Sequence, residues 1–290
     1  MKQIVGISSA LRAFVKKRRL LHRIAVSSRD TLRYKWYQRM GLGYVKDRIV
    51  AGPNQGLVFY AARRVRYSRD FWTGEYELAL CRFLETVVQE DAVCYDIGAN
   101  LGYHTLIMAR RASRGHVFAF EPLPEAAGIL GRNIRENQIG NVALVDKAVF
   151  NKSGLITLGR DLSIDQAAVR WAADDECIHR PFTCEAVRVD DFVSAGNAAP
   201  TLVKIDVEGA ETEVLSGAVE TLARFHPLVV CETHGVHAAG NVFWILREAG
   251  YSLFNVAGRL SPIDSFAGMP KNMYEGHVFA TPQPSAFTPA

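Results

Sequence analysis

The fold of this chain is decided by the stretch Asp96-Ile97-Gly98-Ala99-Asn100-Leu101-Gly102-Tyr103. An apolar segment that begins at Ala92 precedes it, and a helical run from Tyr103 to Arg111 follows it. Strand, glycine turn and helix in this order are typical of a nucleotide-binding βα unit. Asn100 stands in the middle of the turn, and Asn tolerates a positive φ better than other non-glycine residues. The stretch therefore predicts a ligand-binding turn.

Strands and helices alternate on both sides of this turn. A short strand at 59–67 and a helix at 75–88 precede it. Strands follow at 116–121, 142–149, 201–206 and 227–232, with helices at 124–137, 210–222 and 241–249. Alternation of this kind predicts an α/β fold with a mostly parallel sheet and helices on both faces. The last apolar stretches, 251–256 and 277–280, predict a terminal antiparallel hairpin. The whole arrangement resembles the Rossmann-like, seven-stranded class I methyltransferase fold.

Length and composition suit one sizeable domain with an appendage. The chain has 290 residues, 49% of them hydrophobic, enough for a full core. Neither an apolar run of roughly 18 residues nor a signal peptide is evident, so we expect a cytoplasmic protein. The five cysteines show no CxxC or zinc spacing, so we expect reduced thiols.

The charge is concentrated at the start of the chain. Residues 1–50 carry 13 Lys and Arg but only Asp30 and Asp47, which leaves +11 there and −7 in the remainder. We predict a basic helical extension at 1–55 and a domain at 56–290. The segment 12–23 could contact an anionic membrane, a phosphorylated carrier or nucleic acid, or it could be a solvated helix face. Both alternatives stay open at this point.

The glycine turn holds the first candidate site residues. Asp96 ends the strand, and Gly98 and Gly102 let the backbone approach a ligand without a Cβ in the way. Because the turn lacks the G-x-G-x-x-G pattern, it disfavours NAD. His104 lies in the first turn of the helix and could position the ligand or pack in the core. A turn that merely joins strand to helix is the alternative.

Two acidic residues end the next strands. Glu121 precedes Pro122 and could accept hydrogen bonds from both ribose hydroxyls of a nucleoside, although it cannot tell one nucleoside cofactor from another. Asp146 could accept the adenine amino group, or it could be a solvated residue at a strand end.

The segment 202–211, LVKIDVEGAE, is the most distinctive string of the sequence. Burying Lys204 among apolar neighbours is costly unless it is paired. Asp206 and Glu208 follow at the edge where open α/β sheets bind ligands, which indicates the reaction centre. The alternative is that Glu208, Glu211 and Glu213 only complement the positive end of the next helix, and for Glu213 we favour it.

Taken together, four strings resemble the FkbM family of methyltransferases. They are DIGANLGYHT from Asp96, EP at Glu121, LVKIDVEGAETEVLSGA from Leu202 and ETH at Glu232. The resemblance covers roughly residues 75–282. It implies AdoMet as the methyl donor and hydroxyl groups of sugars, glycolipids, polysaccharides or other natural products as acceptors. It also implies that Asp206 and Glu208 lie near the methyl group, and that AdoMet is bound by Asp96, Gly98, Asn100, Gly102 and Glu121.

The end of the fifth strand supplies the candidate base. His234 is our first choice because histidine accepts a proton near neutrality and an alcohol must lose its proton as the methyl group arrives. Since positioning can supply much of the catalysis, a strong base is optional. Asp206, Glu208 and Glu232 could instead form an oxygen-rich Mg²⁺ site. We disfavour that site and assign no metal ligand, because Lys204 and the helix dipole can neutralise the same charges.

An insertion at 155–195 separates the third and fourth predicted strands and is too long for an ordinary connection. It carries Trp171 and Phe182 among charged residues, so we expect these two aromatic side chains, with Glu232, to contact the acceptor. A surface loop whose aromatic residues pack on the domain is the alternative.

Two other functions are compatible with parts of this sequence. A non-catalytic binding protein is disfavoured because Gly98, Gly102, Glu121 and Asp206 are all retained. A nucleic-acid methyltransferase could use the basic arm on phosphates. It is disfavoured because Asp206-Val207-Glu208-Gly209 stands where an Asn-Pro-Pro-Tyr type string is usual.

Overall fold

The computed structural model describes residues 44–62, 68–159, 182–257, 260–272 and 275–283. The chain divides into two compact units, residues 1–45 and 46–290, and the second contains the fold described below. The basic segment 12–23 and Trp171 lie outside the described residues. The predicted extension, the domain boundary at 55 and the limits of the insertion stay predictions.

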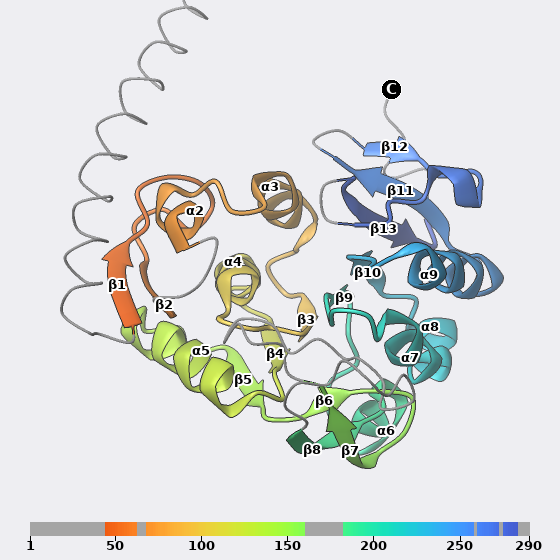
Figure 1. The fold of residues 1–290 in the computed structure, drawn as a ribbon, viewed down its shortest axis with the longest axis horizontal. Helices are drawn as coiled ribbons and strands as arrows, with labels where there is room; N and C mark the ends of the chain where they lie inside the picture. The colour runs from red at the N-terminus through yellow and green to blue at the C-terminus, as the bar shows by residue number, and fades with distance from the viewer. Residues whose placement is uncertain (1–43, 63–67, 160–181, 258–259, 273–274, 284–290) are drawn as a thin grey trace, which may run out of the picture. The chain divides into compact units, whose positions relative to one another are not determined.

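The main sheet has eight strands within the described residues, in the order β12-β11-β13-β10-β9-β3-β4-β5 (Figure 1). Five of them run parallel: β3 (Val93–Ile97), β4 (His116–Phe120), β5 (Val142–Val145), β9 (Leu202–Ile205) and β10 (Leu228–Cys231). The others are antiparallel: β11 (Ser252–Val256), β12 (Leu260–Pro262) and β13 (His277–Thr281). The predicted α/β fold with its terminal hairpin is confirmed. The predicted seven strands omitted only β12, a short strand at the sheet edge.

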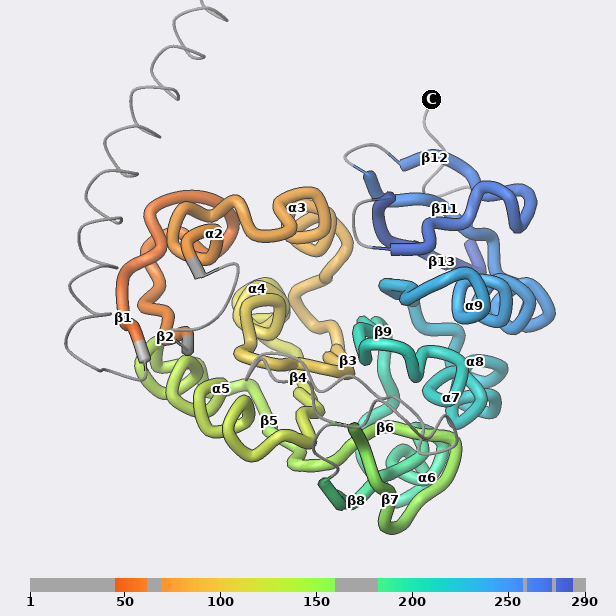
Figure 2. Tube along the Cα trace, viewed as in Figure 1, coloured from red at the N-terminus to blue at the C-terminus, as the bar shows by residue number. Residues whose placement is uncertain are grey.

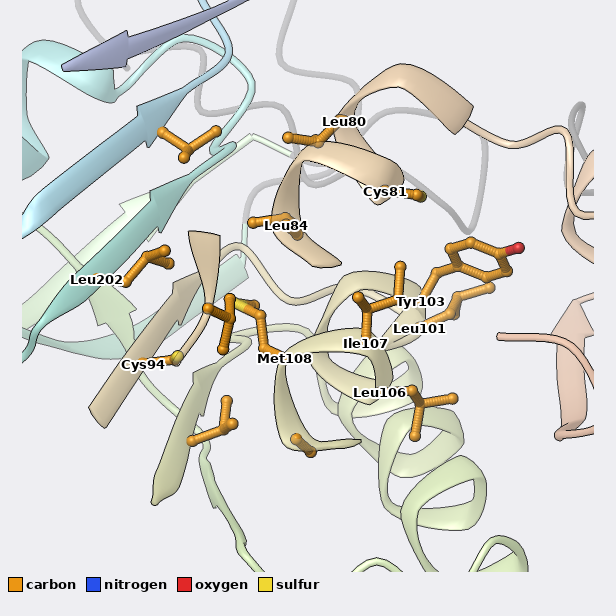
Figure 3. Packing of buried hydrophobic residues seen from close by; sticks show 14 of the residues in the cluster. Leu80, Cys81, Leu84, Cys94, Leu101, Tyr103, Leu106, Ile107, Met108 and Leu202 are labelled. Atoms are coloured by element: carbon orange, nitrogen blue, oxygen red, sulfur yellow. The ribbon is translucent and has the colours of Figure 1, made fainter. Parts of the chain in front are cut away.

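Helices cover both faces of this sheet, as the chain trace in Figure 2 shows. One face carries α3 (Leu78–Val87), α4 (Tyr103–Arg111) and α5 (Pro124–Glu136); the other carries α6 (Val189–Ser194), α7 (Glu211–Ser216), α8 (Val219–Phe225) and α9 (Val236–Glu248). Successive strand residues point to opposite faces. Cys94 and Leu202 therefore pack with Leu84 and Met108 of the first layer (Figure 3), whereas Tyr95 and Val203 pack with the second layer.

Smaller elements flank the main sheet. Strands β1 (Tyr44–Arg48) and β2 (Val58–Ala62) pair, and α2 (Ser68–Thr73) follows them. Phe59 of β2 packs against Phe71 and Tyr103, with ring centroids 5.1 and 5.4 Å away. A one-turn 3₁₀ helix, η1 (Phe266–Gly268), precedes β13.

Two predicted elements were wrong in their extent. The strand expected at 142–149 is two strands, because the Lys147 N–H donates to the Val145 carbonyl and turns the chain. The second part, β6 (Ala148–Val149), joins β8 (Phe182–Val187) and β7 (Gly154–Leu158) in a three-stranded sheet. The helix expected at 210–222 is α7 and α8, which are separated at Gly217. A Cβ on Gly217 would lie 2.3 Å from the Phe150 carbonyl oxygen, so the chain passes too closely there for a larger residue.

Candidate active site

The strand register places four candidate residues in one row. Ile97 of β3 lies level with Phe120 of β4 and with Ile205 of β9. Ile205 in turn lies level with Cys231 of β10. The next residue of each strand therefore reaches the carboxyl edge, the edge at which the parallel strands end: Glu121, Gly98, Asp206 and Glu232.

The glycine turn has the backbone that its residues predict. Gly98, Asn100 and Gly102 all have positive φ, at 78°, 49° and 88°. A Cβ on Gly98 would lie 1.8 Å from the backbone oxygen of Asp206, and one on Gly102 would lie 2.2 Å from a methyl carbon of Leu130. Gly98 is thus required by the close approach of the Asp206 backbone, a reason that the sequence did not reveal. At Gly102 the neighbour is the flexible end of a side chain, and the positive φ is what favours glycine.

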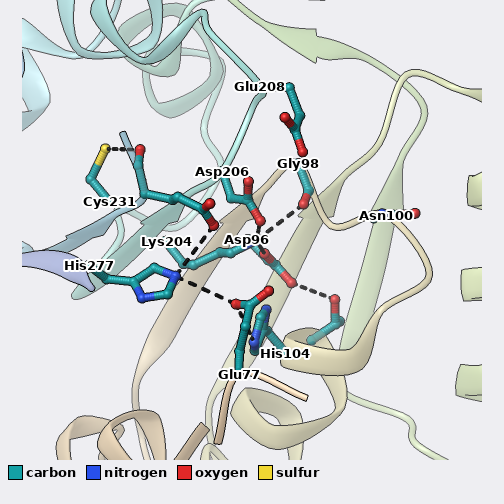
Figure 4. Close-up of polar contacts among 12 residues, drawn as sticks. Glu77, Asp96, Gly98, Asn100, His104, Lys204, Asp206, Glu208, Cys231 and His277 are labelled. Atoms are coloured by element: carbon teal, nitrogen blue, oxygen red, sulfur yellow. Dashed lines mark hydrogen bonds and ion pairs between the residues drawn. The ribbon is translucent and has the colours of Figure 1, made fainter. Parts of the chain in front are cut away.

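Lys204 is paired, as its burial requires. Its Nζ lies 3.3 Å from both the Asp96 and the Asp206 carboxylate and donates to the Gly98 carbonyl oxygen at 3.2 Å (Figure 4). Burial acts to lower the pKa of Lys204, but the charges of Asp206 and Asp96 outweigh it and hold the pKa above its ordinary value. The second oxygen of Asp96 accepts a hydrogen bond from Thr105 at 2.6 Å. Lys204 therefore ties β3, β9 and the glycine turn together.

Glu121 is buried at the end of β4 and accepts hydrogen bonds from backbone N–H groups. One carboxylate oxygen accepts from Asn100 and the other from Leu123, each at 2.8 Å. Burial raises the pKa of Glu121 to about 7, although these two hydrogen bonds act in the opposite direction. The carboxylate fixes the glycine turn, and each oxygen keeps a lone pair for a further donor.

His234 lies among three carboxylates. Its Nδ1 is 2.6 Å from Glu211, and its Nε2 is 3.2 Å from Glu208 and 3.4 Å from Glu232. Burial acts to lower the pKa of His234, but these carboxylates raise it to about 11. The imidazole therefore keeps a proton at neutral pH, which is not the state that a general base requires.

Glu208 offers a better proton acceptor at this position. Its side chain is 31% exposed, and burial together with the charge of Asp206 raises its pKa to about 7. It lies in the left-handed region, with φ 54°, directly before Gly209. Its carboxylate can therefore be ionised at neutral pH and still lie close to the protonated His234.

Three residues of this edge with almost fully buried side chains were missed by the sequence interpretation: Glu77, Glu211 and His277. Glu211 was expected only to complement the positive end of a helix. Its carboxylate instead lies 2.6 Å from His234 Nδ1 and accepts a hydrogen bond from the Gly209 N–H at 3.0 Å. A signal for His277 did exist. Because β13 is antiparallel to β10, it begins at the edge where β10 ends, so the first residue of the hairpin's last strand reaches Glu232.

Of the remaining predicted site residues that the structure describes, only His104 joins this group. It is buried, and its Nε2 lies 3.4 Å from Glu77. Burial lowers the pKa of His104. Asp146 is exposed directly after β5, at the carboxyl edge. Phe182 begins β8, where it is partly buried against core residues.

Among the described helices, none has the length and apolar character needed to cross a bilayer.

Known proteins resemble this chain over most of the sheet. A family model described as "Methyltransferase FkbM domain" matches residues 96–253. The hexuronic acid methyltransferase AglP of Haloferax volcanii is 30% identical over 67% of this chain and 79% of its own. The 2-O-methyltransferase NoeI of Sinorhizobium fredii is 28% identical over 59% of this chain and 76% of its own.

A crystal structure of methyltransferase FkbM from Methylobacillus flagellatus covers 67% of this chain and 44% of its own, with 14% identity and a TM-score of 0.44.

The strand order, the glycine turn and the acidic carboxyl edge define an AdoMet-dependent methyltransferase of class I. Within this class, the match over residues 96–253 shows that the chain belongs to the FkbM methyltransferase family.

Proposed function

We propose that this enzyme transfers a methyl group from AdoMet to a hydroxyl group of a sugar or a sugar-containing molecule. The observation that carries the proposal is the cluster of Asp206, Glu208 and His234, which is partly exposed beside the glycine turn. Carboxylates at such an edge can accept hydrogen bonds from sugar hydroxyls. The names of the relatives AglP and NoeI, a hexuronic acid and a 2-O-methyltransferase, support this acceptor class.

The residues of the glycine turn fit AdoMet. Glu121 is a buried carboxylate whose oxygens can still accept hydrogen bonds from the ribose hydroxyls. It lies next to the glycine turn, whose residues have positive φ values. Asp146, at the end of β5, would accept the adenine amino group. Asp96, Gly98, Asn100 and Gly102 would line the methionine side of the same molecule. When bound, AdoMet supplies an electrophilic methyl group on a sulfonium.

The chain's own residues would position the acceptor and take its proton. Lys204 fixes Asp206, so that this carboxylate can orient an acceptor hydroxyl. Glu208 would accept the hydroxyl proton, because its pKa of about 7 makes it available near neutrality. This assignment replaces His234, whose proton is held by Glu211 and its neighbours. His234 would instead hold Glu208 and Glu232 in place.

Acceptor specificity would come from the insertion. Phe182 lies at the start of β8, and Trp171 lies in the segment outside the described residues. Aromatic faces stack on sugar rings, so both side chains would contact the acceptor, with Glu232 as a hydrogen-bond acceptor. The segment 12–23 would bring the enzyme to an anionic membrane or carrier.

A labelling experiment tests the acceptor class. Radiolabelled AdoMet is incubated with the full chain and with uronic acid glycosides, neutral sugar glycosides, glycolipids or nucleic acid. We expect label in a methyl ether of a sugar fraction and none in nucleic acid. A Glu208→Gln variant should bind AdoMet as the native enzyme does but transfer the label slowly, whereas Glu213→Gln should behave as the native enzyme. Label confined to nucleic acid, or to an amine of any acceptor, would overturn the proposal.

A further inference from the structure

Four side chains from separate elements meet beside the carboxyl edge of the main sheet. Glu77 precedes α3, His104 lies in the first turn of α4, Glu232 follows β10 and His277 begins β13. We call them the His–Glu cluster. Each side chain is at most 7% exposed. Figure 4 shows His277 and Glu77 turned toward each other with His104 beside them.

The facing atoms of this cluster lack ordinary hydrogen bonds. His277 Nε2 lies 3.5 Å from Glu77 Oε2 and 3.4 Å from Glu232 Oε2, and His104 Nε2 lies 3.4 Å from the same oxygen of Glu77. Within the described part of the chain, Glu77 Oε2, His104 Nε2 and His277 Nε2 are buried and make no hydrogen bond. Buried polar atoms are normally satisfied, so atoms that converge without a hydrogen bond point to a missing partner.

The separations between these atoms suit a metal ion. Metal–ligand bonds of about 2.0–2.2 Å place two tetrahedral ligand atoms about 3.3–3.6 Å apart. Donor atoms of Glu77, Glu232 and His277 all lie within 4.8 Å of one another. Two buried carboxylates would carry two negative charges, which a divalent ion neutralises while leaving the imidazole neutral.

The backbone supports the same interpretation. Glu77 has φ 39° and ψ 45°, a left-handed conformation that is unfavourable for a residue with a side chain. Strained residues cluster at functional sites. The donor atoms of a second group, Asp206, Glu232 and His234, also lie within 4.8 Å of one another. That group is less suitable because its members already have partners: Asp206 lies 3.3 Å from Lys204 Nζ, and His234 Nε2 lies 3.2 Å from Glu208.

We propose that Glu77, Glu232 and His277 bind a divalent transition-metal ion of the Zn²⁺ type, with His104 placed beside Glu77. The ligands are one imidazole nitrogen and two carboxylate oxygens, which suit Zn²⁺ and its spectroscopic substitute Co²⁺. The other oxygen of Glu232 lies 3.4 Å from His234 Nε2, which lies 3.2 Å from Glu208, so Glu232 and His234 would separate the ion from the proposed proton acceptor. The inference rests on these side chains alone and does not depend on the acceptor.

The test is metal binding by the tag-free full chain after removal of metals with a chelator. Zn²⁺ and Co²⁺ are titrated into the stripped protein in competition with a chromophoric chelator. We expect one ion per chain, a higher melting temperature on binding and the visible absorption of tetrahedral Co²⁺. His277→Gln and Glu77→Gln should each weaken binding by at least about 10–100-fold, the loss seen when even an outer partner of a metal ligand is removed.

His237→Gln is the matched control, because His237 is exposed on α9 and lies outside the cluster. It should bind the ion as the native protein does. If His277→Gln does not fold, the native titration and Glu77→Gln decide the question. Failure of the stripped native protein to bind either ion, or native affinity in Glu77→Gln, would show that the cluster is a network of ion pairs. Methyl transfer is not measured, so failure here leaves the proposed reaction untouched.

Discussion

Lys204 lies 3.3 Å from the carboxylate of Asp96, and both side chains are almost fully buried, at 4% and 0% exposed. The two residues are 108 positions apart along the chain, yet they are paired partners in the adjacent strands β3 and β9. The ion pair therefore links the glycine turn to the acidic edge, and it makes Lys204 a structural requirement of the site.

Replacing Lys204 with Met should destabilise the protein strongly. The substitution leaves the buried Asp96 and the neighbouring Asp206 without their cation, a loss that typically costs about 3–5 kcal/mol. Urea unfolding measures the change. Lys147→Met is the control, because Lys147 pairs with Glu185 on the surface, where solvent screens the charges and loss of the pair should change the free energy of unfolding far less. Equal losses of unfolding free energy in the two variants would show that the charge of Lys204 does not stabilise the fold.

Gly98→Ala should be more damaging than Gly250→Ala. Both glycines have positive φ, at 78° and 85°, so both substitutions carry the same backbone penalty of about 1–2 kcal/mol. Only at Gly98 does the new Cβ meet the backbone oxygen of Asp206, which adds about 1–3 kcal/mol of overpacking. Thermal unfolding of the two variants compares them directly. A smaller loss at Gly98 than at Gly250 contradicts the close approach of the glycine turn to β9.

AdoMet binding should strengthen as the pH rises through the pKa of Glu121. Burial raises that pKa from its ordinary value of 4.5 to about 7. Between pH 4.5 and about pH 7, the folded protein without AdoMet therefore keeps a proton on Glu121 that the unfolded chain has lost. This proton contributes stability that is complete below pH 4.5 and is lost as the pH rises through 7. Ribose hydroxyls favour the ionised carboxylate, so AdoMet affinity should rise about tenfold from about pH 6 to about pH 8. Calorimetry of the native protein and Glu121→Gln tests this, since the variant should bind weakly and without this pH dependence.

Glu208→Gln should lower turnover by about 10²–10⁴-fold while AdoMet affinity stays unchanged, as expected for loss of a proton acceptor. The turnover of the native enzyme should fall as the pH drops below about 7, where Glu208 becomes protonated. His234→Gln should lower turnover as well, because it releases Glu208 and Glu232. If the pH profile keeps the same inflection in Glu208→Gln, another group accepts the proton.

The sequence by itself determined the fold and most of the carboxyl edge. Short, continuous apolar runs alternating with helices specify a parallel sheet, and the chemistry of Gly98, Asn100 and Gly102 specifies a turn of positive φ. Because parallel strands end at one edge, Glu121, Asp206 and Glu232 could be expected there from their positions alone. These features are local, so neighbouring residues suffice to predict them.

Only the tertiary structure decided what surrounds each of these groups. The three carboxylates around His234 come from the residue after β10 and from the loop and helix after β9, and their combined charge changes the protonation state of His234. His277 reaches Glu232 from the start of β13, and Glu77, directly before α3, reaches His277, although these residues are distant in sequence. Electrostatic fields and metal geometry depend on distances of a few ångströms between separate elements, and those distances are set by packing rather than by local pattern.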